Sequence, residues 1–465
     1  MNRGLAAARS ALTGESVWVV GGAVRDELLG RPGDDVDIVV AGGVEELARR
    51  LGKAKGAAAF PLSEAFGAWR VSERGGTWQA DLMPMEGETI EQDLARRDLT
   101  VNAMAQPLEG GELVDPFGGR ADLEARRLRL VSADALDADP LRVLRLARLA
   151  VELDFDLDPS AREPARRAAP RVADVSAERV FVELKRIVTA PGPAPWLGIA
   201  LLDELGALEP VLPELTAQQG VDQTKYHHLD VYGHTLDALT KLVELERDPS
   251  PLGEHAEAAA AVLAEPLADD LTRGEALRFG ALLHDAAKPL TRGETPDGRV
   301  TFIGHDERGA ELARDALRRL RASEKLQAHV AALTRHHLRL GFLVHITPLS
   351  RRDVHAYLRA CEPVEVDVTV LSVADRLATR GHKADEAIAR HLELARELLG
   401  EALRWRAAGP PEPLVRGDDL AAELGIEPGP ELGRLLDELE AAQFAGEIAT
   451  QEDAVARARE VLAST

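Results

Sequence analysis

Two aspartates, Asp35 and Asp37, alternate along the segment DDVDIVV, and this spacing suits metal chemistry. Side chains of a β-strand alternate between its two faces, so both carboxylates would project to the same side. A few ångström apart, they would repel by roughly 1–4 kcal/mol at effective dielectrics between that of water and about 20. A divalent cation bound to both would remove this repulsion, so the pair is a candidate Mg²⁺ site.

A glycine turn and an arginine precede this pair. Residues 17–20 form a short apolar run that predicts a strand, and Gly21-Gly22 ends it. Glycine lets a ligand approach the backbone closely, so Gly22 is a candidate phosphate contact. Arg25 follows in the first helical turn, and its permanent forked charge suits a phosphate oxygen. The alternative is an ordinary turn followed by solvated carboxylates.

The ordered set GGAVRDELLG…DVD resembles the active-site pattern of nucleotidyltransferases related to DNA polymerase β. It is most similar to the bacterial tRNA nucleotidyltransferase and poly(A) polymerase family. The resemblance implies an α+β protein, with an N-terminal mixed β-sheet (palm) domain followed by mostly helical parts. It also implies that Asp35 and Asp37 are catalytic and hold two Mg²⁺ ions. The implied substrates are CTP, ATP and the 3′ end of tRNA.

Composition sets broad limits on the class of protein. The chain has 465 residues, enough for about three domains. One cysteine, Cys361, excludes internal disulfides and a cysteine-rich zinc site. No run approaches 18 apolar residues, so we expect a cytoplasmic protein with no membrane partner. The net charge of -23 argues against a nucleic-acid partner, but residues 120–190 hold 14 Lys and Arg against 13 Asp and Glu, which leaves room for a local basic groove.

Further segments are expected to complete the N-terminal domain. Residues 44–51 predict an amphipathic helix, and residues 66–72 and 77–83 predict a hairpin that turns at Gly75-Gly76. Asp81 is expected to end the second of these strands, where it could supply a third acidic group or only form a turn.

The segment DLARRDLTVNAMA reads, on its own, as the charged start of a surface helix. It resembles the family's RRDxTxNAM segment, which implies that Arg97 and Asn102 contact the nucleotide. The following DPFGGRADL matches another family turn, with Asp115, Gly118, Gly119 and Asp122 in place, and we expect a structural role for it.

The segment DADPLRVLRLARLAVEL predicts a helix with Asp139 as its N-cap. Asp139, Arg142, Arg145 and Arg148 are three residues apart and would form one ridge, which is usually a solvated face. The segment resembles the family's EDxxR motif, which implies that Asp139 and Arg142 select the base and that Arg145 and Arg148 serve the triphosphate. Ala138 replaces the glutamate of that motif. Residues 178–188 match the family's ERxxxEL helix, an expected brace for this site.

One departure from the family pattern concerns the nucleotide added. Family members that build the whole CCA end carry a flexible loop between the strand of Asp81 and the RRD segment. Only DLMPMEGETIEQDLA separates them here. Members that add only CC lack that loop, so the resemblance favours CC addition, with a separate enzyme adding the terminal A.

After a Pro- and Gly-rich linker at residues 189–196, the chain presents histidines in a second pattern. His234, the His284-Asp285 doublet and Asp375 are candidate ligands of one metal, and His305 with either His336 or His337 could hold a second ion. The pattern resembles the HD phosphohydrolase superfamily, which implies a transition metal such as Ni, Mn, Co or Fe. The alternative is a retained scaffold whose ligands are idle.

These patterns predict four domains: a catalytic head (1–125), a helical neck for nucleotide selection and RNA binding (126–195), an HD domain (196–400) and a helical tail (401–465). The predicted function is a tRNA nucleotidyltransferase that adds C, A or both to the tRNA 3′ end. Two alternatives remain. One is a poly(A) polymerase of the same family, and the other is an HD-type phosphohydrolase whose head only binds RNA. No sequence feature indicates an oligomeric state.

Overall fold

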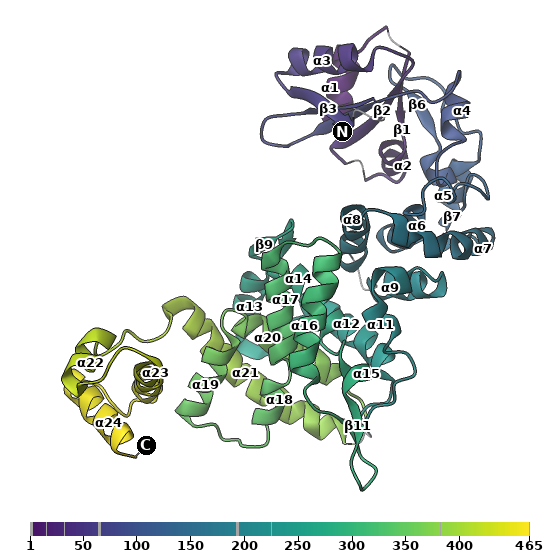
Figure 1. Ribbon diagram of the computed structural model, residues 1–465. Coiled ribbons are helices and arrows are strands. Elements are labelled where there is room, and N and C mark those ends of the chain that lie inside the picture. Colours follow the sequence, from purple (N-terminus) through teal and green to yellow (C-terminus); the bar gives the residue numbers. More distant parts are fainter. Residues whose placement is uncertain are drawn as a thin grey trace. The chain divides into compact units, whose positions relative to one another are not determined.

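The computed structural model describes residues 3–14, 16–31, 33–63, 67–191, 195–224, 226–381 and 383–464. The chain forms two compact units, Met1–Ile187 with Gly198–Pro210 and Val188–Leu197 with Val211–Thr465. The first unit contains a mixed sheet and the second is mainly helical, as Figure 1 shows, so the predicted α+β class is confirmed. Part of the predicted linker, residues 192–194, lies outside the described residues.

A six-stranded sheet in the order β3-β4-β5-β2-β1-β6 forms the core of the first unit. Its strands are β1 (Val17–Val20), β2 (Asp35–Val40), β3 (Ala58–Ser63), β4 (Ala68–Ser72), β5 (Gln79–Pro84) and β6 (Ala105–Pro107). The pairing of β2 with β5 is parallel, and the other pairings are antiparallel. The predicted strand, turn, helix and strand of residues 17–40 are present, with α2 (Gly22–Leu28) between β1 and β2.

The two edge strands, β3 and β6, are not predicted by the sequence pattern. Each contains a proline, Pro61 or Pro107, which lacks the N–H that a central strand needs and is tolerated at an edge. Asp81 lies inside β5 rather than at its end, so the expected position of this residue was wrong.

Different elements cover the two faces of the sheet. On one face lie α1 (Arg3–Ala11) and α3 (Val44–Lys55), the latter longer than the predicted 44–51. A Cβ placed on Gly4 of α1 would lie 3.2 Å from the Val36 side chain, so Val36 faces these helices. On the other face, Val20 and Val39 pack against α4 (Ile90–Leu94). Because side chains alternate along β2, Asp35 and Asp37 share the face of Val39.

The rest of the first unit is mostly helical. It comprises η1 (Thr100–Asn102), α5 (Gly119–Glu124), β7 (Arg127–Leu128), α6 (Arg142–Leu153), β8 (Asp156–Leu157), α7 (Pro159–Ala168), η2 (Ala169–Asp174), α8 (Ala177–Val188), α9 (Pro195–Glu204) and α10 (Leu208–Val211). The predicted N-cap of α6 was wrong, because the α-helix begins at Arg142. Asp139 belongs to a tighter preceding turn, in which its carbonyl accepts a hydrogen bond from the Arg142 amide.

A bundle of long helices forms most of the second unit. Its helices are α11 (Pro213–Thr216), α12 (Val231–Arg247), η3 (Ser250–His255), α13 (Ala256–Leu263), α14 (Arg273–Leu283), α15 (Lys288–Thr291), α16 (His305–Arg319), α17 (Glu324–His336), α18 (Arg339–Leu343), α19 (Arg351–Cys361), α20 (Glu365–Ala378) and α21 (Ala384–Ala408). Two small hairpins, β9 (Pro266–Ala268) with β10 (Leu271–Thr272) and β11 (Arg292–Glu294) with β12 (Val300–Phe302), complete it. Among the described residues, no helix combines the length and apolar character needed to cross a membrane.

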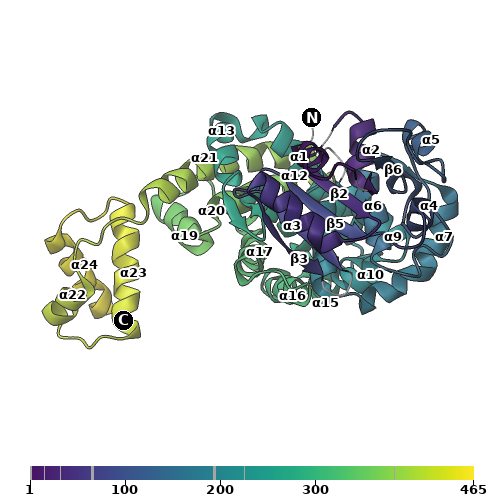
Figure 2. The ribbon, with the colours of Figure 1, turned by 90° about the horizontal axis from the view of Figure 1, so that it is seen from above.

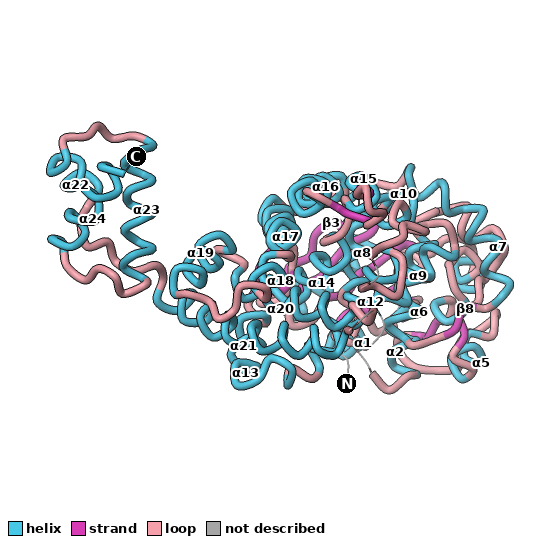
Figure 3. Tube along the Cα trace, turned by 90° about the horizontal axis from the view of Figure 1, so that it is seen from below, coloured by secondary structure: helices cyan, strands magenta, loops and turns pink. Residues whose placement is uncertain are grey.

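The C-terminal tail has its own small core. Figure 2 shows α22 (Gly417–Leu424), α23 (Pro430–Phe444) and α24 (Gln451–Ser464) gathered beyond the end of α21, and Figure 3 shows only helices and loops there. Leu420, Leu435 and Ala454, one from each helix, are buried together. The predicted helix, glycine and helix are present, with Gly425 in the left-handed conformation that ends α22.

Candidate active site and candidate metal centre

A cleft of about 620 Å³ lies in the first unit, over the face of the sheet that carries Asp37. Seven arginines and four carboxylates line it, so this cleft is cationic although the whole chain carries a net charge of -23. Its lining includes eight of the predicted site residues: Gly22, Arg25, Asp37, Arg97, Asn102, Arg142, Arg145 and Arg148. Asp35 and Asp139 are not among the lining residues.

The acidic edge of the cleft is formed by two parallel strands. Asp37 of β2 pairs in register with Asp81 of β5, and Asp35 is two residues before Asp37 on the same face. Burial, and then the Asp81 carboxylate, raise the pKa of Asp37. Arg70 of β4 donates two hydrogen bonds of 2.7 Å to Asp81. Asp81 therefore lies near the predicted pair, with part of its charge already balanced.

Two guanidinium groups lie beside the glycine turn. Gly21 has φ 65°, and a Cβ there would meet Arg97 Nη1 at 3.2 Å and Asp37 Oδ2 at 3.4 Å. A Cβ on Gly22 would meet Arg25 Nη2 at 3.4 Å. Arg25 is held by a two-pronged ion pair with Asp26 and by a 2.7 Å bond from its Nη1 to the Asn102 amide oxygen. This turn therefore presents open backbone beside fixed cations, which is the environment a phosphate group requires.

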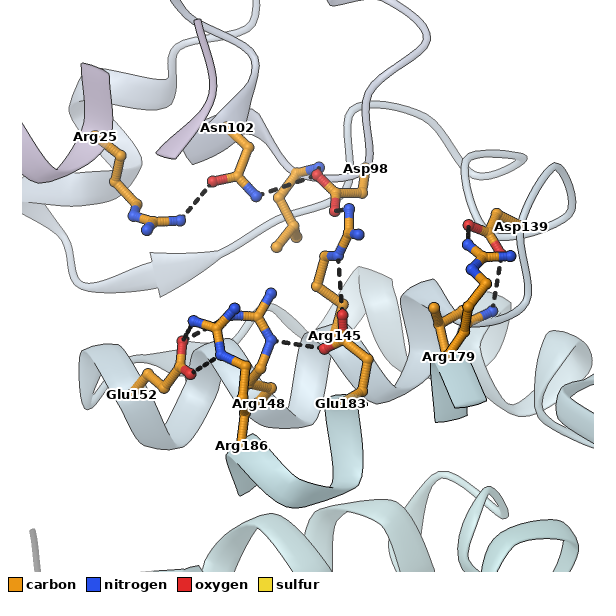
Figure 4. A network of polar contacts seen from close by, with 12 residues as sticks. Arg25, Asp98, Asn102, Asp139, Arg145, Arg148, Glu152, Arg179, Glu183 and Arg186 are labelled. Atoms are coloured by element: carbon orange, nitrogen blue, oxygen red, sulfur yellow. Dashed lines mark hydrogen bonds and ion pairs between the residues drawn. The ribbon is translucent and has the colours of Figure 1, made fainter. Parts of the chain in front are cut away.

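A chain of polar contacts connects the turn with helices α6 and α8 (Figure 4). Asn102 donates to Asp98, and Asp98 accepts a 3.0 Å bond from Arg145 Nη1. Despite burial, which opposes the shift, Arg145 lowers the pKa of Asp98. The expectation that the RRD segment starts a surface helix was wrong, because α4 ends at Leu94 and Asp98 is only 5% exposed.

The same chain of contacts continues through a glutamate of α8. Buried Glu183 accepts a 2.6 Å bond from buried Arg148 and lies 3.7 Å from Arg145 Nε. Arg148 also donates to Glu152, which in turn accepts two bonds from Arg186. The charge of Arg148 is therefore balanced within the protein. Residues 178–188 were expected to act as a brace, and Glu183 of α8 holds helix α6 through this arginine.

Arg142 differs from the other cleft arginines. Its Nη1 and Nη2 donate to the backbone carbonyls of Ala135 and Arg96, and it forms no ion pair with any carboxylate in the described part of the chain. Asp139 is paired instead with Arg179 of α8, from which its Oδ2 accepts a 2.6 Å hydrogen bond. Figure 4 shows the Asp139–Arg179 pair set apart from the contacts around Glu183.

The second unit contains a buried cluster of histidines and aspartates. Within the described residues, two groups have ligand atoms close enough to share a metal ion: His234, His284 and Asp375, and Asp285, His305 and His337. His284 Nε2 lies 3.1 Å from Asp285 Oδ2, and His305 Nε2 lies 3.4 Å from Asp285 Oδ1, so Asp285 lies between the two groups. The structure brings His337 to this cluster, whereas His336 lies outside and accepts a bond from Arg339.

Hydrogen bonds orient three of these imidazoles. The Nδ1 atoms of His284, His305 and His337 lie 2.8, 2.6 and 2.6 Å from the carbonyls of Ala281, Phe302 and Thr334. A carbonyl can only accept, so each Nδ1 donates, and in the neutral ring each Nε2 would offer a lone pair to the cluster. Burial lowers the pKa of His337 to about 4, which keeps it neutral. Both Asp285 oxygens are buried without a hydrogen bond from a described residue, although Lys288 Nζ lies 2.7 Å from Oδ2. These donors fit divalent transition metals.

A mixed sheet, a glycine turn flanked by arginines and carboxylates on adjacent strands together define a nucleotidyltransferase head. Comparisons with protein-family models agree. Residues 17–129 match the poly A polymerase head domain, 154–219 the probable RNA and SrmB-binding site of polymerase A, 231–380 the HD domain, and 408–458 a putative tRNA nucleotidyltransferase domain 2.

Similar proteins cover nearly the whole chain. The A-adding tRNA nucleotidyltransferase of Deinococcus radiodurans is 38% identical over 94% of this chain and 93% of its own. The CC-adding enzyme of Thermus thermophilus is 37% identical over 95% and 93%. The Thermotoga maritima CCA-adding enzyme solved with tRNA shares the fold, with a TM-score of 0.61 and 20% identity over 99% of this chain and 94% of that one. The chain belongs to the bacterial tRNA nucleotidyltransferase and poly(A) polymerase family, and these relatives do not favour the two alternatives stated above.

Proposed function

We propose that this enzyme adds the two cytidines of the CCA end to tRNA from CTP, without a nucleic-acid template, and that a separate enzyme adds the terminal A. The observation that carries the proposal is the short connection between β5 and α4, which consists of residues 85–89 only. Family members that build the whole CCA end carry a flexible loop there. Sequence identity does not decide between the two activities, since an A-adding relative is 38% identical to this chain and a CC-adding relative 37%.

The cleft residues fit nucleotidyl transfer. The 3′-oxygen of tRNA attacks the α-phosphorus of CTP, the new O–P bond forms as the bond to the β-phosphate oxygen breaks, and pyrophosphate leaves. The Gly22 turn with Arg25 and Arg97 holds the phosphates, and Arg145 adds positive charge. Asp139 and Arg142 read the base, because a carboxylate accepts from the cytosine amino group and a guanidinium donates to the ring acceptors.

The carboxylates of Asp35 and Asp37 would hold Mg²⁺. The donor set fits this ion, because hard carboxylate oxygens at the cleft edge, together with substrate phosphates, are its usual ligands. Burial, and then the Asp81 charge, raise the pKa of Asp37, and a bound cation would favour its ionised form. When bound, Mg²⁺ would neutralise the triphosphate and favour ionisation of the 3′-hydroxyl.

The test uses tRNA transcripts that end before CCA, after C and after CC, each with CTP or ATP alone. We expect two cytidines to be added to the first transcript, one to the second and none to the third, with no adenosine on any. Addition of adenosine to the transcript ending in CC would contradict CC-only activity. Long adenosine tails on unrelated RNA would instead support the poly(A) polymerase alternative.

A second activity is supported by the histidine cluster. We propose that it holds two transition-metal ions, one on His234, His284 and Asp375 and one on His305 and His337, with Asp285 between them, and that it hydrolyses phosphate esters. Buried ligand atoms that lack a hydrogen bond within the described chain, together with the oriented imidazoles, support this reading over idle ligands. The test compares hydrolysis of p-nitrophenyl phosphate and its bis-ester in Mn²⁺ or Ni²⁺. The variant H284N should lose hydrolysis and keep CTP incorporation, and hydrolysis that survives in H284N would contradict the proposal.

A further inference from the structure

Helix α8 holds the base-reading segment through two side chains of opposite charge. Arg179 and Glu183 are one helical turn apart and therefore lie on the same side of α8. Arg179 donates to Asp139, the acceptor of the proposed base-reading pair, and Glu183 accepts from Arg148 and lies near Arg145 (Figure 4). The carboxylate before α6 and two arginines along α6, Arg145 and Arg148, are thus each next to an opposite charge from α8.

The Arg179 contact leaves Asp139 able to accept a further hydrogen bond. Asp139 Oδ2 accepts from Arg179 Nη2 at 2.6 Å, and Oδ1 accepts from the Leu141 amide at 3.2 Å. A carboxylate offers about four lone-pair directions, so two remain for a base. On the other side of the turn, Arg142 is fixed by two backbone carbonyls, which leaves the rest of its five donors free. Both members of the pair are therefore oriented before a nucleotide binds.

The Asp139–Arg179 pair contributes little to stability. The Arg179 side chain is 54% exposed and that of Asp139 is 26% exposed, and ion pairs this accessible to water contribute little to folding. A contact that is short but weakly stabilising is well suited to orient a side chain. It can also be removed without unfolding the protein, which makes its role measurable.

We propose that Arg179 is a positioning residue for nucleotide selection, which acts by fixing the carboxylate of Asp139 against the amino group of cytosine. The inference rests on the proposed function. Uracil presents an acceptor where cytosine presents an amino group, so a fixed carboxylate repels UTP and a mobile one can turn away. Selection of CTP over UTP is therefore the property that depends on Arg179.

The experiment measures kcat/KM for CTP and UTP with a tRNA transcript ending before CCA, for the wild type and for R179Q, R179K and R126Q. R126Q is the matched control, because Arg126 forms a 2.7 Å ion pair with Asp154 at the other end of α6, and both of these side chains are exposed. We expect the CTP-to-UTP ratio to fall about tenfold in R179Q, in proportion to the loss of one well-placed base contact. R179K should recover most of the ratio, R126Q should match the wild type, and the melting temperatures should stay alike. R179M repeats the test if R179Q does not fold.

A double-variant cycle shows whether Arg179 acts through Asp139. In a D139N background, R179Q should change the ratio by less than twofold. The inference would be overturned if folded R179Q kept the wild-type CTP-to-UTP ratio, or if R179Q lowered that ratio equally in the D139N background. The proposed function would still stand in either case if the wild type transferred cytidine. A wild-type protein that transfers no cytidine would overturn both.

Discussion

Asp37 and Asp81 lie opposite each other in the parallel register of β2 and β5. Burial and the Asp81 charge together raise the pKa of Asp37, so the fold holds a carboxylate where ionisation is unfavourable. Arg70 forms its ion pair with Asp81 and offsets the charge of that residue. Asp37 lines the cleft. Arg97 and Arg145 offset part of this effect, and the raised pKa of Asp37 is what we expect of the carboxylate proposed to hold a divalent ion.

Close backbone packing at Gly119 predicts that one added methyl group lowers the stability of the protein. A Cβ on Gly119 would lie 2.2 Å from the Thr100 carbonyl oxygen, a contact that no side-chain rearrangement can relieve. We expect G119A to lower the free energy of unfolding by about 1–3 kcal/mol, measured by urea denaturation. G42A is the control, since a Cβ on Gly42 meets nothing within 4 Å, and its effect should stay within about 0.5 kcal/mol. Equal stability of the two variants would contradict this packing.

Local sequence signals predict the centre of the sheet and miss its edges. The apolar run of residues 17–20, the glycine turn and the alternating aspartates are each sufficient to place β1, α2 and β2. Strands β3 and β6 contain Pro61 and Pro107, which disfavour a strand locally and are accepted only because these strands lie at the edges of the sheet. Whether a strand lies at an edge depends on the whole sheet, so the sequence of either segment alone does not predict it.

Docking of the tail should depend on pH through one glutamate of α23. Glu438 accepts bonds from Arg352 of α19 and Arg457 of α24, and these arginines lower its pKa from 4.5 to about 2. A carboxyl group whose pKa is lower in the folded state stabilises that state above the unfolded value, and this stabilisation is lost as pH falls from 4.5 toward 2. We therefore expect E438Q to speed amide exchange in α23 at pH 7, and the difference from the wild type to shrink across that interval.

The matched control for this pH effect is E431Q. Glu431 is an exposed residue of the same helix that pairs with no cation of the described chain. Its replacement should leave amide exchange in α23 unchanged at pH 7 and at pH 3. A difference between E438Q and the wild type that stayed constant from pH 7 to pH 3 would show that the ion pair does not hold the tail.

Adjacent histidines provide a test of the metal centre. His337 belongs to the second ligand group, and His336 lies outside it. After loading with Mn²⁺ or Ni²⁺ and desalting, the wild type and H336N should each retain two ions per chain by elemental analysis. H337N should retain one, because its first group is intact. Two ions in H337N, or one in H336N, would contradict the assignment.

The sequence predicts most of the residues of the candidate site, but it does not predict the contacts between them. Family motifs name Arg25, Arg97 and Arg142, and these residues line one cleft. The bond between Asp98 and Arg145 joins residues 47 apart in sequence, and no local pattern indicates it. The choice between His336 and His337 likewise depends on which side of a helix end faces the core, and both sit in the same short motif.

The most direct test of the central claim is cytidine transfer by D37N, which replaces one carboxylate oxygen with an amide of the same size. The control is D34N, a change at an exposed aspartate just outside the proposed metal-binding pair. With a tRNA transcript ending before CCA, labelled CTP and Mg²⁺, we expect D37N to lose activity by about a thousandfold or more and to bind tRNA within about twofold of the wild type. D34N should remain active. Cytidine transfer by D37N at a tenth of the wild-type rate or above would contradict the assignment of this cleft as the catalytic centre.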